Sequence, residues 1–238
     1  MNILNGNALV TGAGSGIGRQ LSLAYVRAGV KGITLADVNK DGVLETAKLI
    51  QAEFPDVKVL PLVVDVTNET SVNDMVDQAV KTFGTLDYAA NAAGVVVKSR
   101  EKSAYVPTSE FDRDKRRAQI GSIINFASVC GFQAMLNVMP YVASKHAVLG
   151  MTRSAALEHG PEGLRVNAVC PGIADTPFIA DLKTLKGGNE QDPVFANPLG
   201  RLCYPDEIAD AVVFLSSTMS SYVNGIALVS DGGKSVQY

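Results

Sequence analysis

The stretch TGAGSGIG, residues Thr11–Gly18, decides the fold. It follows the apolar run NALVTG (7–12) and opens a stretch with helical character, so it predicts a tight turn between a buried strand and a helix. Gly12 permits the turn, Gly16 lets the backbone approach a pyrophosphate, and Gly18 allows the helix to pack closely on the strand. Backbone N–H groups at the start of the helix favour phosphate charge. A glycine-rich turn alone could also be a simple loop, but the strand before it and the helix after it favour a dinucleotide site.

The rest of the chain continues this alternation of strand and helix. The strand-length runs are apolar throughout, which predicts strands buried on both faces. We therefore expect a single α/β domain, residues 1–238, built on a parallel, doubly wound sheet with right-handed crossovers. The expected strands are 7–12, 32–37, 58–66, 86–94, 121–128, 164–172 and 225–233, and the expected helices are Gly18–Gly29, Lys40–Glu53, Glu69–Phe83, Tyr141–Gly160 and Pro205–Ser216.

Composition narrows the class of partner. The chain has 238 residues, 47% of them hydrophobic, and a net charge of −3, so neither nucleic acid nor a membrane is an expected partner. No apolar run reaches transmembrane length. The three cysteines (Cys130, Cys170 and Cys203) lack metal or disulfide spacing. They predict reduced thiols in a cytoplasmic protein, and no metal site is expected.

An acidic residue follows the glycine-rich turn at the distance that dinucleotide sites use. Asp37 ends the second expected strand, 19 residues after Gly18. A carboxylate there accepts hydrogen bonds from ribose hydroxyls and repels a 2′-phosphate. Val38 and Asn39, rather than a basic residue, come next. The position favours NAD, with NADP still possible, and the competing interpretation of Asp37 is a strand-end cap.

Two further strand ends carry candidate ligands. Asp65 ends the third expected strand, where it could accept a hydrogen bond from an adenine amino group, and the run NAAG (Asn91–Gly94) ends the fourth. In an open α/β sheet the ligand lies at the carboxyl ends of the strands. Each of these features alone is also explained by ordinary turn chemistry.

A tyrosine and a lysine share one helix face. Tyr141 and Lys145, in YVASK, are four residues apart. A free tyrosine titrates near ~10, and a neighbouring ammonium lowers that pKa, which would make Tyr141 an acid/base for an alcohol–ketone pair. The pair alone could be surface neighbours. Ser128 changes this interpretation, because it ends a buried strand 13 residues before Tyr141 and could hydrogen-bond a substrate oxygen.

Taken together and in order, the motifs TGAGSGIG, NAAG, Ser128, YVASK and PGIADTP (171–177) resemble the short-chain dehydrogenase/reductase superfamily, in its short single-domain branch with a Rossmann fold. The resemblance implies that Ser128 orients a carbonyl oxygen, Tyr141 moves the proton, and Lys145 lowers the Tyr141 pKa and binds the nicotinamide ribose. The implied cofactor-binding residues are Gly12, Ser15, Gly16, Ile17, Gly18, Asp37, Asp65, Val66, Asn91, Tyr141, Lys145, Ile173 and Thr176.

The same resemblance implies an NAD(P)-dependent oxidoreductase that interconverts a secondary alcohol and a ketone, acts on a small molecule and forms a homodimer or homotetramer. The loop after Pro177 would form a substrate lid. Phe132, Met135 and Phe178 would line an apolar wall, unless they are core residues. The alternative is a redox-silent relative that isomerises, cyclises or only binds its ligand. A purely structural protein is disfavoured because the three catalytic candidates are retained.

One connection departs from the family. Only 26 residues lie between Gly94 and Gly121. The resemblance therefore implies that the helix between the fourth and fifth strands is missing or truncated, together with the asparagine of the family's proton relay. If the deletion is genuine, a strip of the sheet would face solvent or a partner. Three interpretations remain. The sequence omits a helix, with its junction at Arg113–Asp114, or the chain is genuine and altered in function, or it is genuine and active with water or a substrate group replacing the asparagine.

Overall fold

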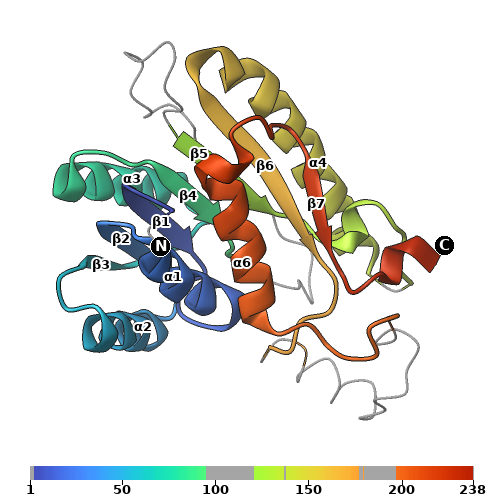
Figure 1. Cartoon of the computed structure of the whole chain (residues 1–238), viewed down its shortest axis with the longest axis horizontal. Helices are drawn as coiled ribbons and strands as arrows, with labels where there is room; N and C mark the ends of the chain where they lie inside the picture. Colours follow the sequence, from blue (N-terminus) through green and yellow to red (C-terminus); the bar gives the residue numbers. More distant parts are fainter. Residues whose placement is uncertain (1–2, 95–120, 137, 177–178, 180–196, 238) are drawn as a thin grey trace.

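The computed structural model describes residues 3–94, 121–136, 138–176, 179 and 197–237 (Figure 1). These residues form a seven-stranded parallel sheet with the order β3-β2-β1-β4-β5-β6-β7, which confirms the doubly wound prediction. The connection between β4 and β5, where a truncated helix was expected, falls on residues 95–120 and lies outside the described residues. The strands are β1 (Asn7–Thr11), β2 (Gly32–Asp37), β3 (Lys58–Val63), β4 (Tyr88–Asn91), β5 (Gly121–Phe126), β6 (Leu164–Pro171) and β7 (Ala227–Ser230).

Helices cover both faces of the sheet (Figure 1). The alternation of side chains along β1 shows why: Ala8 and Val10 join the core cluster beneath one set of helices, and Leu9 joins the cluster on the opposite face. The first set is α1 (Gly16–Ala28), α2 (Lys40–Glu53) and α6 (Pro205–Ser216), and the second is α3 (Glu69–Phe83) and α4 (Met139–His159).

Short polar residues and glycines set the ends of these helices. Asn39 and Asn68 cap α2 and α3 by accepting backbone N–H groups at 3.1 and 3.0 Å, contacts that contribute about 1 kcal/mol each. Gly29 ends α1 in the left-handed conformation with φ 107°. The caps place the start of each helix directly after the strand that precedes it, so the carboxyl edge of the sheet is lined by short turns.

The two edge strands differ from the prediction that every strand is buried on both faces. Strand β3 is half-buried, with Val63 58% exposed, and in β7 Val229 is 38% exposed. Both strands lie at the ends of the sheet order, so each has a neighbour on one side only. Apolar composition alone does not distinguish a central strand from an edge strand.

The strip of sheet beside the short connection was expected to lie open. Ala89 of β4 and Ile123 of β5 point to the face that α3 and α4 cover, and each is only 6% exposed. Both join a cluster with Ala156 of α4. The sheet is therefore covered at these two residues. In the described parts of the chain, no helix combines the length and apolar character needed to cross a membrane.

Candidate active site

The parallel sheet brings the candidate residues to one edge. The glycine-rich turn follows β1, Asp37 ends β2, Asn91 ends β4 and Ser128 comes two residues after β5. Because the strands are parallel, their carboxyl ends meet at the same edge of the sheet. Residues from four separate parts of the sequence therefore line a common edge, at the point where the sheet order changes direction between β1 and β4.

The glycine-rich turn has the backbone that its sequence predicts. Gly12 and Gly16 adopt φ values of 73° and 51°, in the left-handed region that favours glycine. A Cβ on Gly18 would lie 2.0 Å from the Gly12 carbonyl oxygen, so helix α1 packs directly on the turn. Ser15 precedes α1 without a side-chain capping hydrogen bond, and the first turn of α1 carries no acid. The N-terminus of α1 thus suits an anion.

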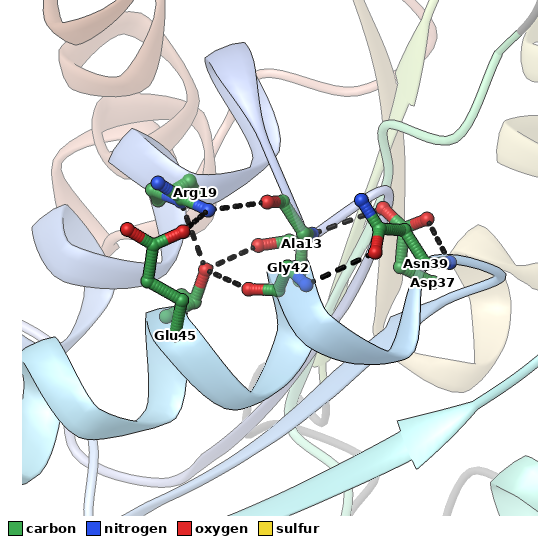
Figure 2. A network of polar contacts seen from close by, with 8 residues as sticks. Ala13, Arg19, Asp37, Asn39, Gly42 and Glu45 are labelled. Carbon is green, nitrogen blue, oxygen red and sulfur yellow. Dashed lines mark hydrogen bonds and ion pairs between the residues drawn. The ribbon is translucent and has the colours of Figure 1, made fainter.

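Asp37 is fixed next to this turn (Figure 2). Its Oδ2 accepts the Gly14 N–H at 2.9 Å and its Oδ1 accepts the Asn39 N–H at 3.0 Å. The competing interpretation, a strand-end cap, is therefore also true in the structure. Two backbone donors hold the carboxylate in place beside the glycine-rich turn. This is the position expected for an acid that would accept hydrogen bonds from ribose hydroxyls.

The other adenosine-side candidates are less engaged with the turn. Asp65 is exposed and accepts both the N–H and the hydroxyl of Thr67, which lower the pKa of its carboxyl group. This turn chemistry also ends β3 before the predicted residue 66. Val66 is half-buried against the α3 cluster. Asn91 donates from Nδ2 to Asn125 Oδ1 at 3.1 Å, and among the described residues its buried Oδ1 has no partner.

Ser128, Tyr141 and Lys145 come together around the start of α4. Ser128 is buried and starts a 3-10 turn, η1 (Val129–Gly131), accepting the Cys130 N–H at 3.2 Å. The turn packs against α4, because a Cβ on Gly131 would lie 3.1 Å from the Lys145 carbonyl oxygen. The Ser128 side chain lies close enough to Tyr141 to lower the pKa of the phenol, and Lys145 Nζ lies 5.5 Å from the centre of the Tyr141 ring.

The electrostatics of this group differ from the sequence argument. Burial raises the pKa of Tyr141 above its ordinary value, and the nearby Ser128 side chain only partly offsets this rise. Burial also lowers the pKa of Lys145. Burial therefore outweighs the expected effect of Lys145 on the phenol pKa, and the Lys145 Nζ donates a hydrogen bond to the Phe126 carbonyl at 2.8 Å. Burial thus favours the protonated form of the phenol.

The segment after β6 lies across the glycine-rich turn. A Cβ on Gly16 would stand 3.6 Å from Thr176 Cγ2, and Ile173 is held by the N–H of Cys203, which donates to its carbonyl at 3.1 Å. Thr176, a candidate for the nicotinamide end, therefore lies beside Gly16 of the glycine-rich turn. Of the predicted apolar wall, Phe132 is 44% exposed and Met135 half-buried. Phe178, Pro177 and the lid loop lie outside the described residues.

Two cysteines lie near this group, although the sequence analysis predicted them only as reduced thiols and not as site residues. Cys130 adjoins the Ser128 turn, and Cys170 lies near the end of β6, within electrostatic reach of Lys145. Burial raises the pKa of Cys170 to about 11, so it stays a neutral thiol. The signal available was position: Cys130 follows Ser128 by two residues, and Cys170 precedes the PG of PGIADTP. In the described residues no three His, Cys, Asp or Glu side chains are grouped as metal ligands.

Family models match almost the whole chain. The model described as short chain dehydrogenase matches residues 6–117, and the model described as enoyl-(acyl carrier protein) reductase matches residues 113–235, which is more than half of the chain. The chain belongs to the short-chain dehydrogenase/reductase family. This short-chain dehydrogenase is therefore an NAD(P)-dependent oxidoreductase. The two matches meet at residues 113–117, around the junction at Arg113–Asp114.

Known relatives share its full length. A short-chain dehydrogenase named anuF from Penicillium roqueforti is 38% identical, with 98% of this chain and 97% of the relative covered. The crystal structure of a levodione reductase superposes with a TM-score of 0.83 at 31% identity, and each chain is 98% covered. The L-sorbose reductase of Gluconobacter frateurii, solved with NADPH and L-sorbose, gives 0.82 at 28% identity, again with 98% of each chain covered.

The alignment lengths bear on the short connection. The comparison with the Penicillium protein extends over 271 residues, 33 more than the 238 of this short-chain dehydrogenase. At least that many positions of the relative have no counterpart here.

The described site also fits a nicotinamide dinucleotide. Its phosphates would meet the N-terminus of α1 at the glycine-rich turn, and its hydroxyls would meet the fixed Asp37 carboxylate and the unpartnered Asn91 Oδ1.

Proposed function

We propose that this protein interconverts a secondary alcohol and a ketone with NAD as its preferred cofactor, and that Tyr141 is the acid/base. The observation that carries the proposal is the convergence of Ser128, Tyr141 and Lys145 beside the carboxyl edge of the sheet. A bound nicotinamide would supply or accept the hydride. The residues of the chain have the remaining tasks of orienting the substrate oxygen and moving its proton.

Each of the three side chains has a distinct task in the proposal. The hydroxyl of Ser128, held by the Cys130 N–H, orients the substrate oxygen toward Tyr141. Tyr141 carries its proton at neutral pH, since burial keeps its pKa above the ordinary value, and in the proposed reaction it donates that proton to the ketone oxygen. Lys145 already lies over the phenol ring, where its positive charge stabilises the phenolate that forms.

The reaction class is tested with purified protein, NADH and a panel of ketones. We expect NADH consumption in a fixed ratio to the alcohol formed, measured by absorbance and chromatography. Binding of NADH without turnover of any ketone or alcohol would instead favour the redox-silent relative. Failure to bind NADH or NADPH would contradict the proposal as a whole.

The NAD preference rests on the Asp37 charge. Replacing Asp37 with alanine should lower the ratio of kcat/KM for NADH to that for NADPH by about tenfold or more, because a like charge beside the 2′-phosphate costs several kcal/mol. Asp37→Asn separates charge from hydrogen bonding, since it keeps an acceptor for the Gly14 N–H. An unchanged ratio in both variants would contradict the assignment.

A matched control removes the same charge elsewhere. Asp56 is exposed and lies just before β3, at the opposite edge of the sheet from Asp37. Asp56→Ala should leave the cofactor ratio within about twofold, because an exposed charge at that distance is largely screened. An equal shift in both variants would attribute the preference to net charge rather than to the Asp37 site.

The status of the short connection has its own measurement. An intact mass above 25.1 kDa for the protein made from its natural gene would identify a segment that this sequence omits. A mass of 25.1 kDa together with ketone reduction would mean that the reaction proceeds without the family's relay asparagine. The same mass without turnover would support the redox-silent alternative.

A further inference from the structure

Arg19 holds one peptide group of the glycine-rich turn. Its Nη2 donates to the Gly14 carbonyl at 2.7 Å and to Glu45 Oε2 at 2.7 Å, and its Nε donates to Thr46 Oγ1 at 3.1 Å (Figure 2). Arg19 belongs to α1, whereas Glu45 and Thr46 belong to α2. The guanidinium therefore joins the turn to both of the helices that follow it, and none of these three partners is a predicted ligand of the cofactor.

The preceding peptide group is held at both of its ends. Thr46 Oγ1 donates to the Ala13 carbonyl at 2.8 Å, and the Gly14 N–H of the same peptide donates to Asp37 at 2.9 Å. In a trans peptide the carbonyl and the N–H point in opposite directions. The Ala13–Gly14 peptide is thus fixed with its carbonyl toward α2 and its N–H toward the end of β2.

The Gly14–Ser15 peptide is held from one end. Arg19 donates a hydrogen bond to the Gly14 carbonyl of this peptide on the side of α2. The Ser15 N–H therefore points to the opposite side, at the N-terminus of α1. Gly42 leaves the space for this arrangement, because a Cβ there would lie 2.6 Å from the Gly14 oxygen. If the Gly14 carbonyl lost Arg19, the peptide could turn over and present a carbonyl oxygen where an anion must bind.

We propose that Arg19 is a positioning residue for the pyrophosphate of the cofactor. It acts through the Gly14–Ser15 peptide, which it orients so that the Ser15 N–H points at the pyrophosphate. The inference rests on the proposed function, because it needs a dinucleotide at the glycine-rich turn. The side chain itself does not touch the cofactor. Its charge is matched by Glu45 on α2, and its side chain is only 22% exposed.

The test compares cofactor binding by wild-type protein and Arg19→Met. Isothermal titration with NADH and with ADP-ribose should show that Kd rises about tenfold for both ligands in Arg19→Met, because both contain the pyrophosphate. A tenfold change corresponds to about 1.4 kcal/mol, close to the lower end of the range for a hydrogen bond to a charged group. The value of kcat at saturating NADH should stay within about twofold, so the effect lies in KM. Arg19→Lys should recover part of the affinity, since an ammonium can reach the Gly14 carbonyl without forming the whole fork.

The controls come from the same pair of helices. Arg27 of α1 and Glu53 of α2 form an ion pair at 3.0 Å that does not involve the turn, so Arg27→Met should leave both Kd values within about twofold. Glu45→Ala removes the ion pair but keeps the Arg19 bond to the Gly14 carbonyl, and it should likewise leave affinity nearly unchanged.

The outcomes separate this inference from the proposed function. If wild-type protein does not bind NADH, the proposed function fails and the role of Arg19 fails with it. If wild-type protein binds while Arg19→Met binds equally well, only the positioning role is overturned. It is also overturned if Arg27→Met weakens binding as much as Arg19→Met, or if kcat falls as far as KM rises.

Discussion

Replacing Tyr141 with phenylalanine should greatly slow ketone reduction while NADH still binds. The substitution removes one hydroxyl from a half-buried ring and leaves the ring's contacts in place. In the proposed reaction that hydroxyl donates the proton to the substrate oxygen, and a positioned acid/base contributes about 10²–10⁴-fold to the rate. Steady-state kinetics should therefore show a fall in kcat of that order, with Kd for NADH within about threefold of the wild-type value.

The matching control is another tyrosine of the same chain. Tyr222 is fully exposed, so Tyr222→Phe should leave kcat and KM unchanged. Activity of Tyr141→Phe within tenfold of wild type would mean that the proton comes from elsewhere, and the assignment would fail. A parallel loss of NADH binding would indicate instead that Tyr141 is needed to shape the cofactor site.

Gly18→Ala is the second change with a large expected effect. The new Cβ would lie 2.0 Å from the Gly12 carbonyl oxygen, a separation that forces helix α1 and the turn apart. The contacted oxygen belongs to the backbone, so no flexible side chain can move to relieve the contact. Overpacking of this kind costs about 1–3 kcal/mol or more, and it displaces the turn that is proposed to hold the pyrophosphate. We expect a lower Tm and loss of measurable NADH binding.

Gly150→Ala supplies the contrast. Gly150 is exposed on α4, and a Cβ there meets no atom within 4 Å. In a helix interior alanine is favoured over glycine by about 1 kcal/mol, so Tm should stay the same or rise. If Gly18→Ala kept the wild-type Tm and affinity, close packing between α1 and the turn would not be needed for the site.

The sequence predicted the elements closely because their signals are local. The ranges of α2, α3 and α6 agree with the prediction residue for residue, since each has a cap or a proline at its start. Errors occurred where side chains or glycines end a strand early. Strand β3 stops at Val63 before the Asp65 turn, and β7 is limited by glycines with positive φ on both sides.

The candidate site was predictable as a set of residues but not as a set of contacts. The glycines and Asp37 carry a spacing that one strand and one helix determine. Arg19 contacts Thr46 of α2, and Lys145 contacts the Phe126 carbonyl of β5. Both contacts depend on how these elements pack, and no local sequence pattern predicts them. Lys145 is the clearest case: its spacing from Tyr141 predicted an effect on the phenol pKa, and burial outweighs that effect in the ligand-free protein.

The place of β1 in the sheet also has a consequence during synthesis. Strand β1 pairs on one side with β2, which follows within a few tens of residues, and on the other with β4, where Thr11 meets Asn91. At ribosomal rates of about 5–20 residues per second, the second neighbour leaves the ribosome roughly 4–16 s after β1. For that interval the nascent chain carries an apolar strand with one unpaired edge. Exposed edges of this kind make folding intermediates prone to aggregation, which chaperones prevent.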